Sequence, residues 1–158
     1  MNFLLDILKY DFVEGVIIHI FGDGPELDNF KNKYINFKNI IFHGFKNDII
    51  YYLDHLIDIL ILPTIIPEAA PTIIQQSLSR GVPVITTNIG GQNIFIQNNY
   101  NGISVKPQNS FKIAKAVMKL KNDPKLYNQM SLNCLESSMK FENLDSFKIK
   151  LLDIINKI

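Results

Sequence analysis

Short apolar runs alternate with amphipathic stretches along most of the chain. The apolar runs are rich in β-branched and aromatic residues and are bounded by glycine, proline or polar residues, which is typical of strands buried on both faces of a parallel sheet. Five such strands are expected, at residues 16–21, 39–43, 57–62, 83–87 and 103–105. In the other stretches, apolar residues recur at helical spacing. Helices are expected at residues 2–12, 26–34, 48–55, 71–80, 110–121, 124–139 and 143–158, with a short helical turn at 94–97.

Strands that alternate with helices predict an α/β fold with a doubly wound parallel sheet, covered by helices on both faces. The 158 residues fit one domain with a core of its own. Neither an internal repeat nor a low-complexity linker divides the chain, so we expect a single domain over residues 1–158. The helices over residues 124–158 either pack on the sheet or extend toward a partner domain absent from this chain.

Charge and composition exclude several classes of function. Sixteen basic residues balance 15 acidic ones, and Arg80 is the only arginine, which disfavours a duplex nucleic-acid partner. A lone Cys134 excludes a disulfide framework and a multi-cysteine zinc site, and His19, His43 and His55 form no metal-binding pair in the sequence. No metal is therefore expected. Because there is neither a signal peptide nor an 18-residue apolar run, we expect a cytoplasmic protein.

Three loops that follow strands are expected at one edge of the sheet, where doubly wound folds bind ligands. They cover residues 22–25, 63–72 and 88–92. In the middle loop, Glu68 precedes a helix whose first-turn N–H groups attract phosphate. Each loop also has a purely structural explanation that involves no ligand. In the helix over 71–80, Thr72, Gln76 and Arg80 share one face, and this helix could be an ordinary buried helix with a polar outer stripe. The glycines at 22–24 could serve only a tight turn, and Gly90-Gly91 could be a turn or a place where the backbone approaches a ligand closely.

The order of these features carries a resemblance to a known family. Pro67-Glu68 is followed after seven residues by Gln76, and then by Gly81-Val82-Pro83-Val84, Gly90-Gly91 and Asn101-Gly102. Upstream, the resemblance rests on Gly22-Asp23-Gly24-Pro25, Phe42-His43-Gly44-Phe45 and the run from Asp58 to Thr64. From about residue 3 to about residue 125, the chain resembles the nucleotide-sugar-binding C-terminal half of retaining GT-B glycosyltransferases, of the group 1 or family 4 type. The implied fold is Rossmann-like.

The resemblance implies a role for each matching residue. Glu68 would act in catalysis, by contacting hydroxyls of the donor sugar, and Gln76 stands where a second Glu normally binds the ribose. Backbone amides near Pro71, Thr72 and Ile73 would cradle the diphosphate. The full set of implied donor-binding residues is Gly22, Gly24, Gly44, Thr64, Ile65, Ala70, Pro71, Thr72, Ile73, Gln76, Gly90 and Gly91. The implied reaction moves a sugar from a UDP- or GDP-sugar to a glycan or lipid acceptor with retention. In the family it needs no metal, because the helix dipole and positive side chains stabilise the leaving diphosphate.

The chain also departs from the family pattern. Gln76 lacks the carboxylate's stronger hydrogen bonds, and Ile94 stands where many relatives carry another Glu. Family members begin this domain with a strand that lies in the middle of the sheet, whereas this chain starts in the helix after it. We therefore expect either a gap or direct pairing between the strands that follow residues 15 and 56.

These departures leave three functions open. The first is an enzyme part, incomplete alone, whose acceptor-binding N-terminal half comes from a longer protein or a partner chain; membrane contact would then occur only through a partner or a lipid acceptor. The second is a non-catalytic nucleotide-sugar-binding or regulatory module, which Gln76 and Ile94 favour. The third is an α/β domain for another phosphate ligand, such as a sugar-nucleotide epimerase, which explains the loops but not their order.

Overall fold

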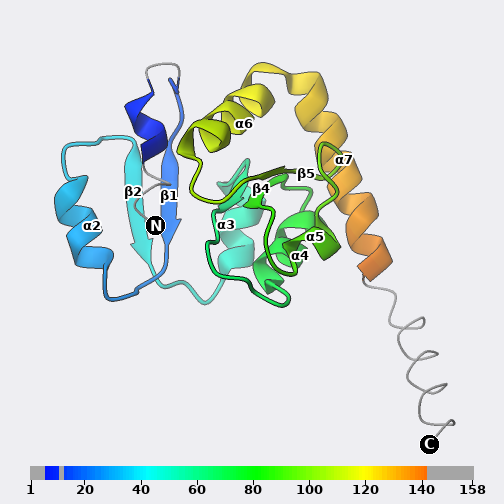
Figure 1. The fold of residues 1–158 in the computed structure, drawn as a ribbon, viewed down its shortest axis with the longest axis horizontal. Coiled ribbons are helices and arrows are strands. Elements are labelled where there is room, and N and C mark those ends of the chain that lie inside the picture. Colours follow the sequence, from blue (N-terminus) through cyan, green and yellow to red (C-terminus); the bar gives the residue numbers. More distant parts are fainter. Residues whose placement is uncertain (1–5, 11–12, 142–158) are drawn as a thin grey trace, which may run out of the picture.

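The computed structural model describes residues 6–10 and 13–141, and it has the expected α/β architecture with parallel strands (Figure 1). The elements are η1 (Asp6–Lys9), β1 (Ile18–Phe21), α2 (Leu27–Lys33), β2 (Ile40–Gly44), α3 (Ile49–His55), β3 (Leu60–Leu62), α4 (Thr72–Ser79), β4 (Val84–Thr87), α5 (Gln92–Phe95), β5 (Gly102–Val105), α6 (Ser110–Asn122) and α7 (Pro124–Phe141). The helix expected over 143–158 lies outside the described residues.

Several element boundaries differ from the sequence-based expectation, and backbone hydrogen bonds account for three of the differences. Within the described part of the expected helix over 2–12, the chain forms only the 3-10 turn η1, where the N–H of Tyr10 bonds three residues back to Ile7. Strand β3 begins later than expected because the N–H of Ile57 still bonds to the carbonyl of Tyr52. Helix α5 begins earlier, directly after the glycine pair, because the N–H of Ile94 bonds to the carbonyl of Gly91.

The strands form two separate parallel sheets. One has the order β1–β2 and the other β3–β4–β5, and no ladder joins β1 to β3 among the described residues. Figure 1 shows β1 on the side of β2 nearer to the three-stranded sheet. Of the two arrangements considered from the sequence, the chain therefore has the gap and not the direct pairing.

One hydrophobic core holds the two sheets together. Ile18 and Ile20 of β1 belong to the same buried cluster as Ile85 of β4 and Ile113 of α6. A fully buried isoleucine contributes about 1.5–3 kcal/mol relative to an exposed one, so this shared core offsets the missing ladder. A second cluster lies under α4 and involves only the three-stranded sheet and its helices.

Among the described residues, no strand pairs with the edge of β3 that faces away from β4. All three residues of β3 are only half-buried, whereas every residue of β4 is buried. The N–H of Leu60 donates to the carbonyl of Pro83 at 3.0 Å. Because backbone groups alternate along a strand, Ile59 and Ile61 direct theirs away from β4. By the same alternation, the backbone N–H and C=O groups of His19 and Phe21 point away from β2, because the N–H of Ile18 donates to the carbonyl of Asn39 at 2.8 Å.

Helix α7 closes the other side of the molecule against α4 and the turn before β5. The side-chain amide of Asn101 donates to the carbonyl of Phe95 and to the hydroxyl of Ser137. Cys134 is completely buried, and burial raises the pKa of its thiol to about 12, so it stays protonated and unreactive. Within the described part of the chain, no helix has the length and apolar character needed to cross a membrane.

Candidate functional site

The loops after β3 and β4 are fastened to each other at the carboxyl edge of the three-stranded sheet. The hydroxyl of Thr86 donates to the carbonyl of Leu62 at 3.0 Å, and the hydroxyl of Thr87 donates to the carbonyl of Thr64 at 2.6 Å. Both threonines are buried, so these hydrogen bonds are shielded from water. They extend the β3–β4 association past the last ladder pair and fix the start of the loop that carries Glu68.

Gly90 and Gly91 let the two loop backbones approach each other closely. The N–H of Gly91 donates to the carbonyl of Glu68 at 2.6 Å, and a Cβ at Gly91 would lie 1.6 Å from the carbonyl oxygen of Ala69. Gly90 has a φ of +63°, and its Cβ would lie 2.7 Å from the backbone of Glu68. The close backbone approach that the glycine pair suggested is therefore to another loop of the chain. The loop after β4 packs directly against the loop that carries Glu68.

The carboxylate of Glu68 lies at the surface, beside the start of α4. The hydroxyl of Thr64 donates to its Oε1 across 3.4 Å, which is a long and weak hydrogen bond. Pro71 occupies the N-cap of α4 in an extended conformation and provides no side-chain cap. The first-turn N–H groups at Thr72 and Ile73 thus lack a capping side chain, and the positive end of the helix dipole favours an anion there.

Gln76 and Arg80 stand on one face of α4, but they lie at different distances from the carboxyl edge of the sheet. Gln76 is half-buried one turn beyond Thr72, still near the carboxyl edge. Arg80, at the C-cap, forms an ion pair with Asp54 at 3.6 Å. An eight-residue helix is about 12 Å long, so Arg80 lies at the opposite edge and does not join Glu68.

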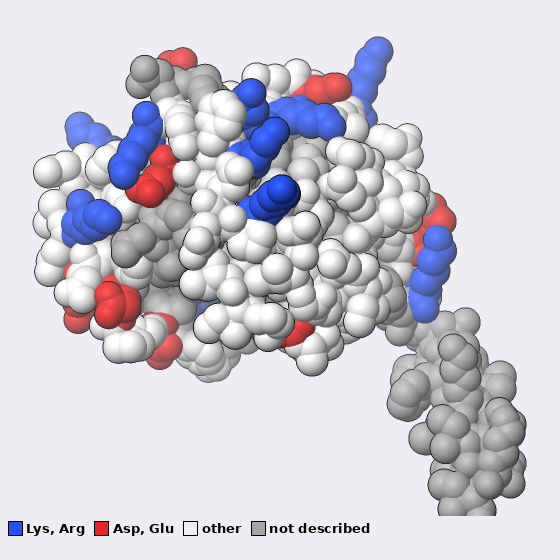
Figure 2. All heavy atoms as spheres, in the orientation of Figure 1, with Lys and Arg blue, Asp and Glu red and all other residues white. Residues whose placement is uncertain are grey.

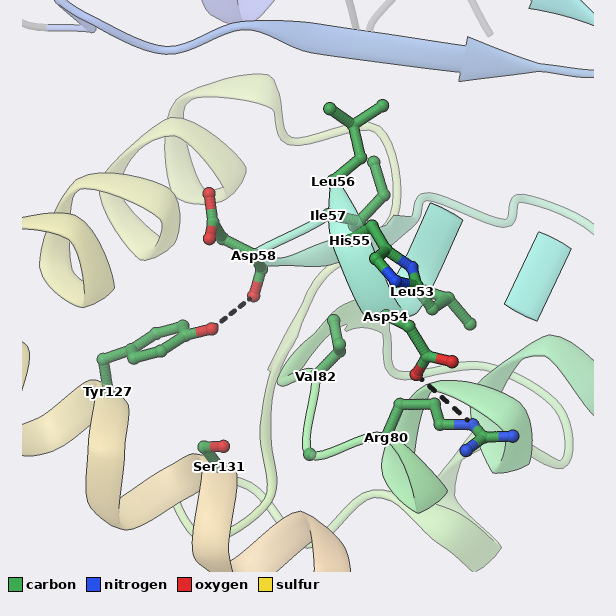
Figure 3. A pocket seen from close by; sticks show the side chains of 11 residues that line it. Leu53, Asp54, His55, Leu56, Ile57, Asp58, Arg80, Val82, Tyr127 and Ser131 are labelled. Atoms are coloured by element: carbon green, nitrogen blue, oxygen red, sulfur yellow. Dashed lines mark hydrogen bonds and ion pairs between the residues drawn. The ribbon is translucent and has the colours of Figure 1, made fainter. Parts of the chain in front are cut away.

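A hollow of about 300 Å³ also lies at that opposite edge (Figure 3). It is formed by residues that precede β3 and β4, including Arg80 and Asp54, and by Tyr127 of α7, whose hydroxyl donates to the carbonyl of Asp58 at 3.1 Å. The ends of α3 and α4 close it on one side. Since it faces the amino-terminal ends of the strands, this hollow is separate from the loops that carry Glu68 and the glycine pair.

The loops after β1 and β2 meet in the same way as those after β3 and β4. The N–H of Gly22 donates to the carbonyl of Gly44 at 2.9 Å. Both glycines have positive φ, and a Cβ at Gly22, Gly24 or Gly44 would meet nothing within 4 Å. These loops therefore leave open space around their backbones. Beside them, Phe45 is exposed, as are Ile65 in the loop after β3 and Ile94 in α5.

Two histidines form a pair across β1 and β2. Nδ1 of His19 lies 2.9 Å from Nε2 of His43, which is a hydrogen bond between the rings. Phe21 stacks on His43 with ring centroids 4.6 Å apart, and Tyr52 of α3 packs edge-on against Phe21. Burial lowers the pKa of both imidazoles, and the charges of His19 and Lys46 lower that of His43 further.

The sequence indicated no metal-binding pair among the histidines and gave no role to Phe21 or Tyr52. Their position near the ends of two adjacent strands was the available signal. Alternation along the strands puts His19, Phe21 and His43 on one face of the two-stranded sheet, and the register of β1 against β2 brings them together. Sequence reasoning also missed Gln92, which is completely buried beneath the glycine pair.

The part of the chain that the structure describes has no cluster of metal-binding side chains at the site. No group of three or more His, Cys, Asp or Glu side chains is close enough to hold a metal ion there. Figure 2 shows lysine side chains over α6. Three of them have partners within the chain: Lys115 lies over the ring of Phe111, Lys119 donates to Asn99 and Lys121 donates to the carbonyl of Glu14.

Parallel strands in this order, with their loops gathered at the carboxyl edge, define a Rossmann-like half of the GT-B fold. The chain belongs to the glycosyl transferases group 1 family, whose model matches residues 4–135. A galactosyltransferase of Escherichia coli, described as UDP-Gal:alpha-D-GlcNAc-diphosphoundecaprenol alpha-1,3-galactosyltransferase, is 28% identical over 96% of this chain and 41% of its own length.

Solved structures agree on the fold. Anabaena Alr3699/HepE in complex with UDP matches with a TM-score of 0.86 at 18% identity, over 100% of this chain and 45% of that one. A glycosyltransferase from Rickettsia africae matches with a TM-score of 0.84 at 25% identity, over 99% of this chain and 43% of that one. The chain thus spans less than half the length of each of these relatives.

Proposed function

We propose that this chain is the donor-binding part of a glycosyltransferase that moves a sugar from a UDP- or GDP-sugar to a glycan or lipid acceptor with retention. The observation that carries the proposal is the arrangement at the carboxyl edge. There, the exposed carboxylate of Glu68 lies beside the uncapped start of α4, on a loop that Gly90 and Gly91 hold in place. Membership of the glycosyl transferases group 1 family supports a nucleotide sugar over other phosphate ligands.

Each part of the donor has a matching group in this arrangement. Hydroxyls of the sugar would donate to the carboxylate of Glu68, and ribose hydroxyls would bond to the side-chain oxygen of Gln76. The diphosphate would accept from the N–H groups of Thr72 and Ile73. When the bond between the anomeric carbon and the diphosphate oxygen breaks, these N–H groups and the helix dipole would stabilise the charge on the leaving diphosphate without a metal.

The nucleobase would lie between the loops of the two sheets. Gly22, Gly24 and Gly44 border open space on one side, and Thr64 and Ile65 lie on the other. Ala70 and Pro71 would shape the backbone that reaches the diphosphate. Titration calorimetry with UDP, UDP-galactose, UDP-glucose and GDP-mannose tests the proposal. We expect at least one of these ligands to bind, and the absence of both heat and a thermal shift with all four would refute it.

The chain alone would transfer little or no sugar, because the acceptor would be bound by an N-terminal half that belongs to a longer protein or a partner chain. The edges of β1 and β3 that pair with no strand of the described residues support this part of the proposal, since a strand from a longer protein or a partner chain could pair with both. Such a protein would act in the cytoplasm, and it would contact a membrane only through a partner or a lipid acceptor.

A non-catalytic donor-binding or regulatory module is the second candidate. Gln76 and Ile94 favour it, because neither supplies the carboxylate that the family pattern has at its position; Ile94 is also 67% exposed and offers no hydrogen bond. Both candidates bind a nucleotide sugar. Release of the nucleoside diphosphate distinguishes them. When the full-length protein, or the chain together with its partner, is given donor and acceptor, only the enzyme part releases it.

A further inference from the structure

The side-chain amide of Gln92 is buried without a hydrogen-bond partner. The residue, which begins α5, is 0% exposed, and neither Nε2 nor Oε1 has a partner among the residues that the structure describes. Buried amides are almost always hydrogen-bonded, because losing water without a replacement partner destabilises the fold. A methionine would fill a similar volume without that penalty. An unpaired amide in this position therefore calls for a physical reason.

The amide lies against the backbone of the Glu68 loop. The point that a Cβ at Gly90 would occupy is 3.1 Å from Oε1 of Gln92 and 2.7 Å from both the N and the O of Glu68. Three polar atoms thus surround one small space beneath Glu68. The neighbouring N–H of Gly91 is already bonded to the carbonyl of Glu68. Because Oε1 of Gln92 and the N of Glu68 both lie near this point, a shift of the loop toward α5 would bring the two atoms into hydrogen-bonding contact.

We propose that Gln92 is a positioning residue for Glu68. In the ligand-free chain its amide is unpaired, and it gains a hydrogen bond to the backbone of Glu68 when the loop moves to hold a donor sugar. Gln92 thereby lowers the free energy of the sugar-bound arrangement relative to the free one, which is how a buried residue can strengthen binding without touching the ligand. This inference rests on the proposed function, since it assumes that Glu68 contacts a sugar.

The proposal separates the effect on stability from the effect on binding. Replacing the amide by an apolar side chain removes an unpaired polar group from the free protein, which raises Tm by about 2–4 °C for a domain of this size. It also removes the hydrogen bond formed in the sugar-bound state. The affinity for a nucleotide sugar then falls by about two- to tenfold, while the affinity for UDP, which has no sugar for Glu68 to hold, stays unchanged.

The test compares the 158-residue chain with its Q92M variant by thermal unfolding and by calorimetry with UDP-galactose and UDP. Q92L is the second variant, in case methionine disturbs packing, and Q75M is the matched control because Gln75 is exposed on α4. A raised Tm with weaker UDP-galactose binding and unchanged UDP binding supports the proposal. A raised Tm with both affinities unchanged, or a lowered Tm, overturns it and leaves the proposed function standing. Failure of the unmodified chain to bind any of UDP, UDP-galactose, UDP-glucose and GDP-mannose overturns both.

Discussion

The backbone N–H of Gly91 donates to the carbonyl of Glu68 at 2.6 Å, and this contact joins the loop after β4 to the loop after β3. It places the exposed Glu68 carboxylate above a close backbone packing that only glycine permits at position 91. The position of Glu68 beside α4 thus depends on a residue in another loop, which contributes no side chain of its own.

Gly91→Ala tests this dependence. The added Cβ would lie 1.6 Å from the carbonyl oxygen of Ala69, so the two loops must separate. We expect a loss of about 1–3 kcal/mol in the free energy of unfolding, together with weaker binding of UDP-galactose. Gly24→Ala is the matched control, because a Cβ there meets nothing within 4 Å, and it should stay within about 0.5 kcal/mol of the unmodified chain. Equal denaturation midpoints for the two variants would contradict this account of the loop packing.

Gln76→Glu should tighten the binding of UDP by about three- to tenfold. A carboxylate accepts stronger, charge-assisted hydrogen bonds from ribose hydroxyls than an amide oxygen does. Gln75→Glu adds the same charge at an exposed neighbouring position on α4 and controls for long-range electrostatics. Calorimetry with UDP measures both. If the two variants change the affinity equally, Gln76 does not contact the ribose.

The His19–His43 pair predicts a pH-dependent stability. Burial lowers the pKa of both imidazoles in the folded chain, and the charge of Lys46 adds to the effect on His43. Because the unfolded chain binds protons more readily, the contribution is fully present above the ordinary histidine pKa of about 6.5 and is lost as the pH falls below that value.

Denaturant unfolding at several pH values between about 5 and 8 measures this contribution. The variant with both His19→Gln and His43→Gln should lose stability less steeply than the unmodified chain as the pH falls below about 6.5. Phe21 and Tyr52, the other side chains in contact with the pair, carry no charge in this range. The same slope in both proteins would show that other groups dominate the pH dependence.

The gap between the sheets predicts an alternating pattern of amide hydrogen exchange. The N–H groups of His19, Phe21 and Ile61 point to the unpartnered edges, so they should exchange at least about a hundredfold faster than that of Ile85 in β4. Ile20, whose N–H points toward β2, is the internal control. Slow exchange at Phe21 and Ile61 in the 158-residue chain would mean that these edges are already paired, and that no strand from outside is needed.

The strands and the edge where their loops gather could be predicted from the sequence because both depend on local patterns. Apolar runs bounded by glycine and proline located every strand, and parallel order placed the loops together. The contacts within the site could not be predicted in the same way. The close packing of Gly91 on Ala69 and the burial of Gln92 depend on how two loops approach in space, which no single segment encodes.

Helical spacing alone did not predict which residues of α4 reach the site. It placed Thr72, Gln76 and Arg80 on one face, but the length of α4 takes Arg80 to the opposite edge, where it pairs with Asp54. The His19–His43 contact depends on the register that sets His19 opposite Ile41, two residues before His43, and no pattern within a single strand fixes that register.

The most direct test of the central claim is calorimetric titration of the 158-residue chain and its Glu68→Gln variant with UDP-galactose and with UDP. If Glu68 holds the donor sugar, the unmodified chain binds both ligands, and the substitution weakens UDP-galactose by about tenfold while leaving UDP unchanged. If the chain binds none of UDP-galactose, UDP-glucose and GDP-mannose, or if it binds UDP-galactose and the substitution leaves that affinity unchanged, Glu68 does not hold a donor sugar.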